Sequence, residues 1–333
     1  MNTLEAVPNF SEGRDPDAVA RIASAMEGVP GAQLLHVDPE ADTHRSVMTL
    51  LGKAEAVEEA LFRGVAAAIE SIDMTHHSGS HPRMGAADVV PFVPWAGTPM
   101  EDCIQSAHRL GRRLGEELDL PGWFYGAAAL SPEAVYLHDI RRGEFEGLPK
   151  KLLSKAVDFG PQSMHPTAGA TAVGARGLLV ALNCTISTDN VGLARKMAGS
   201  LREFQRVRRA KDGSVVQRVS EGLPGLRALG WYSKRDGLAQ VTMNLTNTDE
   251  APPHRVFQRL SQMCSAEGIE IRGSELVGMI PEALLRAAGQ DTEPSSTDPV
   301  SAGIRALRLG VLHDFVPEER IIEWVLRRVD ASG

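Results

Sequence analysis

The sequence predicts an α+β protein made of two similar βαββαβ (ferredoxin-like) α/β sandwiches. Its 333 residues exceed the size of one ordinary core and fit two domains of about 150 residues each. Apolar strand-like runs alternate with segments of helical period, and the order β-α-β-β-α-β occurs once in each half. This order favours helices on one face of largely antiparallel sheets over one doubly wound sheet. We expect the domains to span residues 1–176 and 177–333.

Strands are expected wherever a short apolar or β-branched run is bounded by turn residues. These runs lie at 32–37, 46–51, 89–93, 123–127, 177–186, 227–232, 238–245 and 269–277. Helices are expected where apolar residues recur at helical spacing, at 15–28, 54–72, 98–118, 188–203, 253–267 and 317–328. The segments rich in Gly, Pro, Ser and Thr are expected to form a loop at 158–174 and a mobile connector at 289–299.

Three helix starts carry capping signals. Asp15 is expected to be the N-cap of the first helix, with Pro16 at its first position. Thr98 and Glu101 match the capping-box pattern, in which each side chain accepts a hydrogen bond from the backbone N–H of the other residue. Thr188 is expected to cap a helix in the second half. These signals place the ends of the helices relative to the strands.

Composition and charge exclude several classes of protein. With 43% hydrophobic residues, 23% charged residues and 32 glycines, the chain is globular rather than disordered or fibrous. The net charge of −8 argues against general nucleic-acid binding. The three cysteines are Cys103, Cys184 and Cys264; they lie in apolar periodic segments and are expected to be reduced core residues of a cytoplasmic protein. Neither a basic, apolar leader nor a run of membrane-spanning length is evident, so no membrane association is expected.

The stretch 78–94, S-G-S-H-P-R-M-G-A-A-D-V-V-P-F-V-P, is the main candidate for a site. Glycine, proline and ionisable residues directly precede a buried strand. Reactive side chains are therefore expected at the start of this strand. Pro82 biases the backbone of His81 toward extended geometry. Imidazole both takes up and releases protons near neutral pH. A satisfied surface histidine is the alternative, and the density of Gly, Pro, Arg and Asp around His81 favours a site.

Charged residues near other strand mouths are candidates to assist His81. Asp38 or Asp88 would orient the ring or stabilise its protonated form, and the sequence does not choose between them. For Asp88 a turn or strand-entry role is equally supported. Arg45 and Arg83 carry guanidinium forks that match carboxylates, although a surface ion pair is the commoner fate of an arginine.

Other polar positions allow a functional and a structural interpretation. Asn9 and Ser11 would donate to a substrate from their turn, or they would only build that turn. His77 and His81 have the i, i+4 spacing of a metal pair, but Gly79 and Pro82 oppose the helix that such a pair needs, so no metal is expected. The basic run is either a solvated face or a site for a polyglutamate tail; it comprises Arg202, Arg206, Arg208, Arg209 and Lys211.

Five stretches together resemble the formiminotransferase domain family, which includes the glutamate formimidoyltransferase of histidine breakdown. They are V-P-N-F-S-E-G-R at 7–14, H-R-S-V at 44–47, H-P-R-M-G-A-A-D-V-V-P-F at 81–92, G-A-T-A-V-G-A-R at 169–176 and Q-V-T-M-N-L-T-N at 240–247. The resemblance covers nearly the whole chain. It implies two α/β subdomains with a folate site in the cleft between them, a homodimer, and a chain without the cyclodeaminase fused to the mammalian enzyme.

The resemblance implies transfer of a formimino group from N-formimino-L-glutamate to N5 of tetrahydrofolate, the co-substrate, without a metal. The family's catalytic histidine falls on His81 by direct motif match. The family's folate-contacting loop corresponds to Gly160, Pro161, Gln162, Ser163, Met164, His165, Pro166, Thr167, Ala168 and Gly169. Two positions depart from the family pattern, with His44 in place of Asn and Ala127 in place of Glu.

The reaction requires protons to move between two nitrogens of a tetrahedral intermediate. His81 would take the proton from N5 as it adds and return it to the departing glutamate nitrogen. One alternative is folate-dependent formyl transfer between 5-formyltetrahydrofolate and glutamate, or formimino transfer from another donor. A second alternative is a folate-binding protein without catalysis, which the presence of a tunable base argues against.

Overall fold

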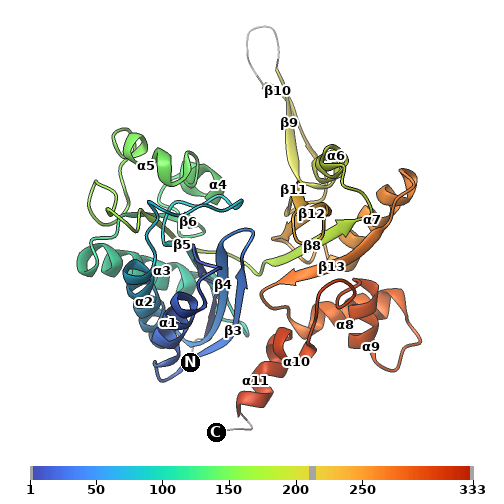
Figure 1. Ribbon diagram of the computed structural model, residues 1–333, viewed down its shortest axis with the longest axis horizontal. Helices are drawn as coiled ribbons and strands as arrows, with labels where there is room; N and C mark the ends of the chain where they lie inside the picture. Colours follow the sequence, from blue (N-terminus) through green and yellow to red (C-terminus); the bar gives the residue numbers. More distant parts are fainter. Residues whose placement is uncertain (1–2, 210–214, 331–333) are drawn as a thin grey trace. The chain divides into compact units, whose positions relative to one another are not determined.

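The computed structural model describes residues 3–209 and 215–330. The chain divides into two compact units, Met1–Gly177 and Leu178–Gly333, which are described separately below (Figure 1). Each unit contains the βαββαβ arrangement that the sequence predicts, so the protein is a mixed α+β fold of two subdomains. In the part of the chain that the structure describes, no helix is long and apolar enough to cross a membrane.

The first unit is built on a seven-stranded mixed sheet. The elements of its βαββαβ core follow in chain order: β1 (Thr3–Ala6), β2 (Asn9–Phe10), α1 (Pro16–Glu27), β3 (Ala32–Glu40), β4 (Arg45–Lys53), α2 (Ala54–Ser71) and β5 (Ala87–Pro94). Strand β4 pairs antiparallel with β1, β2 and β3, and β5 pairs antiparallel with β1 and β2. The resulting order β3-β4-β1-β5 is that of a ferredoxin-like sheet.

A parallel extension widens this sheet beyond β5. It comprises α3 (Met100–Glu117), β6 (Gly122–Gly126), the 3₁₀ turn η1 (Pro132–Ala134), α4 (Leu137–Ile140), α5 (Glu144–Leu152) and β7 (Thr171–Ala175). Strand β7 lies between β5 and β6 and pairs parallel with both. The N-terminal sheet is therefore mixed rather than largely antiparallel, because the α3 crossover returns the chain in the same direction.

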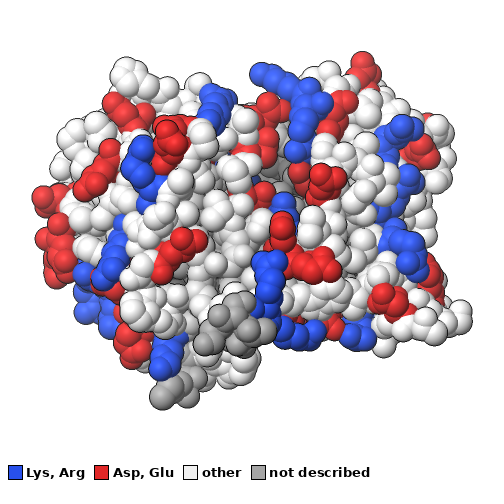
Figure 2. All heavy atoms as spheres, turned by 60° about the horizontal axis from the view of Figure 1, so that its bottom comes forward, with Lys and Arg blue, Asp and Glu red and all other residues white. Residues whose placement is uncertain are grey.

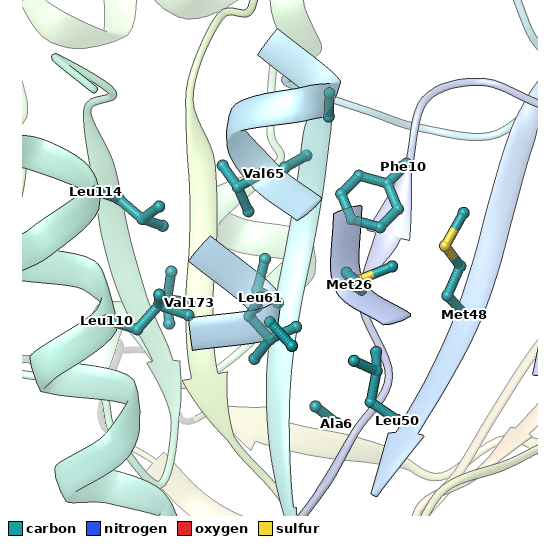
Figure 3. Packing of buried hydrophobic residues seen from close by; sticks show 14 of the residues in the cluster. Ala6, Phe10, Met26, Met48, Leu50, Leu61, Val65, Leu110, Leu114 and Val173 are labelled. Carbon is teal, nitrogen blue, oxygen red and sulfur yellow. The ribbon is translucent and has the colours of Figure 1, made fainter. Parts of the chain in front are cut away.

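The helices bury their apolar faces against the sheet. Figure 3 shows side chains from α1, α2 and α3 gathered over the strands, among them Met26, Leu61 and Leu110, which are buried. Hydrophobic burial of this kind contributes about 1.5–3 kcal/mol for each large side chain. The core thus supports the edge of the sheet at which the ionisable residues lie.

The second unit repeats the core arrangement in a four-stranded antiparallel sheet of order β11-β12-β8-β13. Its elements are β8 (Val180–Ile186), α6 (Val191–Leu201), β9 (Phe204–Arg209), β10 (Val215–Glu221), β11 (Leu226–Ser233), β12 (Leu238–Leu245), α7 (Pro253–Ala266), β13 (Ile271–Val277), α8 (Glu282–Thr292), α9 (Pro299–Ala306), α10 (Pro317–Arg320) and α11 (Ile322–Asp330). Strands β9 and β10 form a separate hairpin that the sequence pattern did not predict. Of the basic run, Arg202 lies at the end of α6, and Arg206, Arg208 and Arg209 lie in β9. Lys211 lies outside the described residues, as do the side chains of Arg206, Arg208 and Arg209.

Several local predictions are confirmed. Asp15 caps α1 by accepting hydrogen bonds from the backbone N–H groups of Asp17 and Ala18. All three cysteines are free and buried in the described structure. Burial raises the pKa of the Cys103 thiol to about 12, which keeps it protonated and unreactive at neutral pH.

Two predicted caps are wrong. Thr98 is not an N-cap, because its hydroxyl donates to the Thr3 carbonyl oxygen of β1 at 2.8 Å and Pro99 takes the cap position. The second-half helix begins after Asn190, whose side chain accepts from the Leu193 amide at 3.1 Å, while the Thr188 hydroxyl accepts from the Asn190 amide. The Thr98 hydroxyl is thus used by a strand distant in sequence, and the Thr188 hydroxyl by a local turn.

Three predicted segments also differ. The loop expected to extend to residue 174 ends before β7, whose small residues fit between two neighbouring strands. The expected connector at 289–299 is shorter, because α8 extends through Thr292 and α9 begins at Pro299. A Cβ on Gly289 would lie 1.8 Å from the Pro299 carbonyl oxygen, so glycine lets α8 and α9 touch. The final helix is broken at Ile321, which has extended backbone geometry and separates α10 from α11.

Figure 2 shows the charged side chains on one face of the molecule. Lysine and arginine residues alternate with aspartate and glutamate residues across that face.

Candidate active site

The loop between α2 and β5 carries His81 and is fixed from two sides. The Ser11 hydroxyl donates to the Gly85 carbonyl oxygen at 2.8 Å, and the Ser11 amide donates to the Ala86 carbonyl oxygen at 2.8 Å. On the other side Gly85 forms a β-bridge with Gly169. A Cβ on Gly85 would lie 2.0 Å from the Ala170 carbonyl oxygen, so only glycine allows this approach. The loop is therefore held at the mouth of β5.

His81 faces a guanidinium group rather than a carboxylate. Its Nε2 lies 2.8 Å from Nη1 of Arg45, the first residue of β4. Arginine only donates hydrogen bonds, so Nε2 is the acceptor and the proton of the neutral ring is on Nδ1. Burial, followed by the charges of Arg45 and Arg141, lowers the pKa of His81 well below its usual value, although a backbone hydrogen bond with Pro82 opposes this. His81 is thus a neutral base at pH 7 with its lone pair on Nε2.

Asp88 lies inside β5 and binds two groups. It is 1% exposed; one carboxylate oxygen accepts from Nη2 of Arg141 and the other accepts from the Met84 amide at 2.9 Å. Asp38 lies on β3, which pairs with β4. It is opposite Val47, two residues after Arg45. Burial, and then the charge of Arg141, lower the pKa of Arg45 to about 10. The charges of Asp88 and Asp38 oppose this shift. Both predicted carboxylates therefore act on the charge of Arg45, and Asp88 is bound to Arg141.

His44, a departure from the family pattern, lies in the turn before β4. Its φ of +52° is unusual for a residue other than glycine. Its Nδ1 lies 2.9 Å from the Ser78 carbonyl oxygen and its Nε2 lies 3.0 Å from Oε1 of Glu12. Each ring nitrogen of His44 therefore lies beside an oxygen atom, one from the His81 loop and one from the turn before α1. The ring also stacks on that of His77, with centroids 4.2 Å apart, and connects the two loops.

Arg83 is occupied by protein carboxylates. Its side chain is 9% exposed, and its fork donates to Glu144 at 3.0 Å and to both oxygens of Glu146 at 2.6 and 2.9 Å. Its Nε donates to Nδ1 of His77 at 3.2 Å. The hydrogen bond from Arg83 lowers the pKa of Glu146 to about 2 despite opposing desolvation. In this structure Arg83 therefore joins the His81 loop to α5, and a substrate carboxylate would have to compete with two glutamates.

Asn9 lies in β2, between β4 and β5. Its side-chain amide donates to the Val7 carbonyl oxygen at 3.0 Å, which is the turn-building role. Its neighbour Phe10 pairs with Ser46 of β4 on one side and with Ala87 of β5 on the other. This register brings Arg45 and Asp88 to the same end of the sheet, on the two strands that flank β2.

The loop 160–169 packs directly against the loop that carries His81. The Ala86 amide donates to the Ala168 carbonyl oxygen at 2.9 Å, and the Met74 amide donates to that of Thr167 at 2.8 Å. Gly160 and Gly169 have φ of +77° and +75°, in the region that favours glycine. Backbone hydrogen bonds therefore bring the C-terminal end of the predicted folate-contacting loop, residues 167–169, next to the His81 loop.

Sequence reasoning missed Arg141, Glu144 and Glu146. These residues lie in the short polar segment around α4 and α5, where no periodicity or motif marks them. Only their contacts with Asp88 and Arg83, more than 50 residues earlier in the chain, reveal them. Within residues 3–209 and 215–330, no three His, Cys, Asp or Glu side chains are grouped to hold a metal ion.

Comparison with known families covers most of the chain. Residues 3–176 match the N-terminal subdomain of the formiminotransferase domain, and residues 181–327 match the formiminotransferase domain. Both matched regions fall within the two compact units of the structure.

Comparison with individual proteins gives relatives of two lengths. The chain is 37% identical over 284 residues to glutamate formimidoyltransferase of Streptococcus pyogenes serotype M1, covering 85% of this chain and 90% of that protein. It is 39% identical over 289 residues to glutamate formimidoyltransferase of Thermoplasma acidophilum, covering 86% and 90%. Formimidoyltransferase-cyclodeaminase of Mus musculus is 39% identical over 332 residues, which are 97% of this chain and 60% of that protein. The chain thus spans about 60% of the length of the longer relative.

Proposed function

The chain belongs to the formiminotransferase domain family, and from this premise we propose that it is a glutamate formimidoyltransferase. It transfers the formimino group of N-formimino-L-glutamate to N5 of tetrahydrofolate. The relatives named glutamate formimidoyltransferase, at 37% and 39% identity, support this activity. The observation that carries the proposal is the neutral His81 ring, whose Nε2 lone pair lies beside the guanidinium of Arg45.

His81 acts as the general acid and base. N5 attacks the formimino carbon, and a tetrahedral intermediate forms with N5 and the glutamate nitrogen on the same carbon. Nε2 takes the proton that N5 loses and returns it to the glutamate nitrogen as the C–N bond breaks, so the proton balance is zero. A group in this role contributes about 10²–10⁴-fold to the rate. The depressed pKa of His81 keeps the ring in the accepting form at neutral pH.

Arg45 binds a substrate carboxylate and in doing so releases Nε2 of His81. In the structure Nη1 of Arg45 donates to this nitrogen. A carboxylate is a stronger acceptor for a guanidinium than a neutral imidazole, because both partners are then charged and the guanidinium fork can bind both carboxylate oxygens. Substrate binding therefore withdraws the donor from Nε2 and frees the lone pair for the proton of N5.

The remaining candidates have supporting roles. Asp38 and Asp88 balance the charge of Arg45, and Asn9 and Arg83 hold the β2 turn and the His81 loop in place. The loop 160–169 binds tetrahydrofolate, as the family resemblance implies, and its packing beside the His81 loop supports this. The same resemblance supports a cytoplasmic homodimer without a metal, which light scattering and metal analysis of the purified protein test.

Turnover with tetrahydrofolate and N-formimino-L-glutamate tests the proposed function. The formation of 5-formiminotetrahydrofolate is followed by its absorbance. Parallel reactions contain N-formyl-L-glutamate with tetrahydrofolate, or 5-formyltetrahydrofolate with L-glutamate. We expect turnover in the first reaction at a rate that exceeds the other two. Turnover confined to a formyl reaction would assign a different one-carbon group, and folate binding without any turnover would contradict the enzymatic assignment.

A further inference from the structure

A second guanidinium lies beside His81 and Arg45. Arg141 caps the C-terminal end of α4, and its Nη2 donates to Asp88 in β5. The register of β2 places Asp88 and Arg45 at the same end of the sheet, two strands apart. Neighbouring strands are about 4.8 Å apart, so an arginine held on Asp88 is within side-chain reach of Arg45. Arg141 is among the charges that lower the pKa of both Arg45 and His81.

This pair of guanidiniums retains unused donors. Nε of Arg45 and Nε of Arg141 are both buried, and neither has a hydrogen-bond partner in the described part of the chain. A buried N–H group without a partner is unfavourable, because it has lost its hydrogen bond to water and gained none in exchange. Asp88 is bound directly to Arg141. The charges of Asp88, Glu40 and Asp38 act on Arg45. The arrangement therefore has both the free N–H groups and the positive charge that an anion would satisfy.

The two groups of the site suit an α-amino acid derivative. In such a compound the nitrogen and the carboxylate share one carbon, so the nitrogen and the nearer carboxylate oxygen are about 3 Å apart. Nε2 of His81 and the guanidinium of Arg45 are adjacent, joined by a hydrogen bond that the substrate would replace, so neighbouring atoms of one ligand can reach both. If Nε2 serves the reacting nitrogen, the guanidiniums beside it reach the α-carboxylate, whereas the γ-carboxylate of glutamate is two bonds farther along the side chain.

We propose that Arg141 and Arg45 together bind the α-carboxylate of the formimino donor, with Asp88 as the positioning residue for Arg141. The inference rests on the proposed function and names the part of the donor that this site recognises. Arg83, the other arginine that the sequence singles out, is already bound to Glu144 and Glu146. Recognition of an α-carboxylate predicts that the enzyme accepts N-formimino amino acids and discriminates against their α-carboxamides.

Substrates that lack one charge at a time test this assignment. The donors are N-formimino-L-glutamate, its α-carboxamide and its γ-carboxamide. The variant is Arg141→Lys, which keeps a cation beside Asp88 but removes the fork that binds a carboxylate. The matched control is Arg142→Lys, because Arg142 is 79% exposed and pairs only at the surface with Asp139. Circular dichroism establishes that each protein is folded.

For the native enzyme we expect kcat/KM to fall about 10–100-fold with the α-carboxamide, as expected for the loss of a charge-assisted pair. Arg141→Lys should lose a similar factor on N-formimino-L-glutamate and on the γ-carboxamide, and little more on the α-carboxamide. The Arg142→Lys control should behave as the native enzyme. Equal losses of Arg141→Lys on all three donors would reduce Arg141 to a structural role and overturn the inference.

A binding measurement separates this inference from the proposed function. Calorimetry with L-glutamate, the product of the proposed reaction, and with its α-carboxamide requires no turnover. Weaker binding of L-glutamate to Arg141→Lys, with no change for the α-carboxamide, supports the site even if the transferred group is formyl. If Arg141→Lys does not fold, the double variant Asp88→Asn with Arg141→Gln removes both buried charges together and is compared in the same way. Unchanged glutamate binding in the folded variant would contradict the proposed carboxylate site.

Discussion

Replacing Arg45 with glutamine should raise the pKa of His81. The substitution removes a guanidinium whose Nη1 donates to Nε2 at 2.8 Å and which favours the neutral ring. Two unit charges about 4 Å apart interact by about 4 kcal/mol at an effective dielectric constant of 20. This free energy is an upper limit on the effect, because burial, the largest cause of the lowered pKa, persists in the variant. We therefore expect the pKa of His81 to rise toward the ordinary histidine value without reaching it.

Nuclear magnetic resonance titration of the His81 ring measures this shift, with the resonance assigned from the His81→Asn variant. The activity profile should move with it: kcat/KM falls when His81 is protonated, so its acid limb lies below the ordinary histidine pKa in the native enzyme and moves to higher pH in Arg45→Gln. Arg63→Gln is the matched control, because Arg63 pairs with Glu59 on the surface of α2. If the ring titrates alike in the native protein and in Arg45→Gln, the Arg45–His81 contact does not control the protonation state.

The remaining predictions concern the two loops around His81. Arg83→Met should lower the free energy of unfolding by about 1–3 kcal/mol in urea titrations, with KM little changed, because its partners are protein glutamates. The pKa of Glu146 is lowered from 4.5 to about 2, so its contribution to stability is present above about pH 4.5 and is lost toward pH 2; this dependence should be weaker in Arg83→Met, and an unchanged dependence would exclude the cross-link. Gly169→Ala should cost about 2–4 kcal/mol and weaken folate binding, because the added Cβ meets the Met84 carbonyl oxygen at 2.4 Å. Gly97 also has a positive φ, but a Cβ there would meet nothing within 4 Å. If Gly97→Ala lowers the free energy of unfolding as much as Gly169→Ala does, backbone strain alone explains the loss of stability.

The βαββαβ cores were predictable because their signals are local. Asp15 and Pro16 mark the start of α1, and the period of apolar residues in α2 and α3 marks the faces that they bury. The strand predicted at 238–245 has the observed bounds of β12. These elements require no knowledge of distant partners, since pattern and capping together determine them.

The elements that were missed depend on partners that the sequence does not display. β7 is a run of small residues whose strand geometry comes from pairing with β5 and β6. Hairpin β9–β10 contains a basic run without strong hydrophobic alternation. The mobile connector expected at 289–299 was inferred from composition, but contact through Gly289 and Gly303 packs α8 against α9. Tertiary contacts override local propensity at β7 and between α8 and α9, whereas the β9–β10 hairpin forms by pairing of its own two strands.

For the candidate site, the residues were predictable from local motifs but their contacts were not. The motif stretches led to His81, Arg45 and Asp88, and the structure places these residues at one end of the sheet. The pairing was not predictable: a carboxylate partner was expected for His81, but a guanidinium contacts it and Asp88 binds Arg141 instead. Arg141 follows Asp88 by 53 residues, and only the folded chain brings the two together.

Single-turnover kinetics of the native enzyme and His81→Asn test the central claim most directly. Formation of 5-formiminotetrahydrofolate is measured beside calorimetric binding of 5-formyltetrahydrofolate to both proteins. We predict that His81→Asn loses about 10²–10⁴-fold in the rate of transfer while its affinity for the folate changes little, because His81 moves protons and does not bind the pterin. A His81→Asn variant that transfers the group at the native rate would contradict the account and remove His81 from the mechanism.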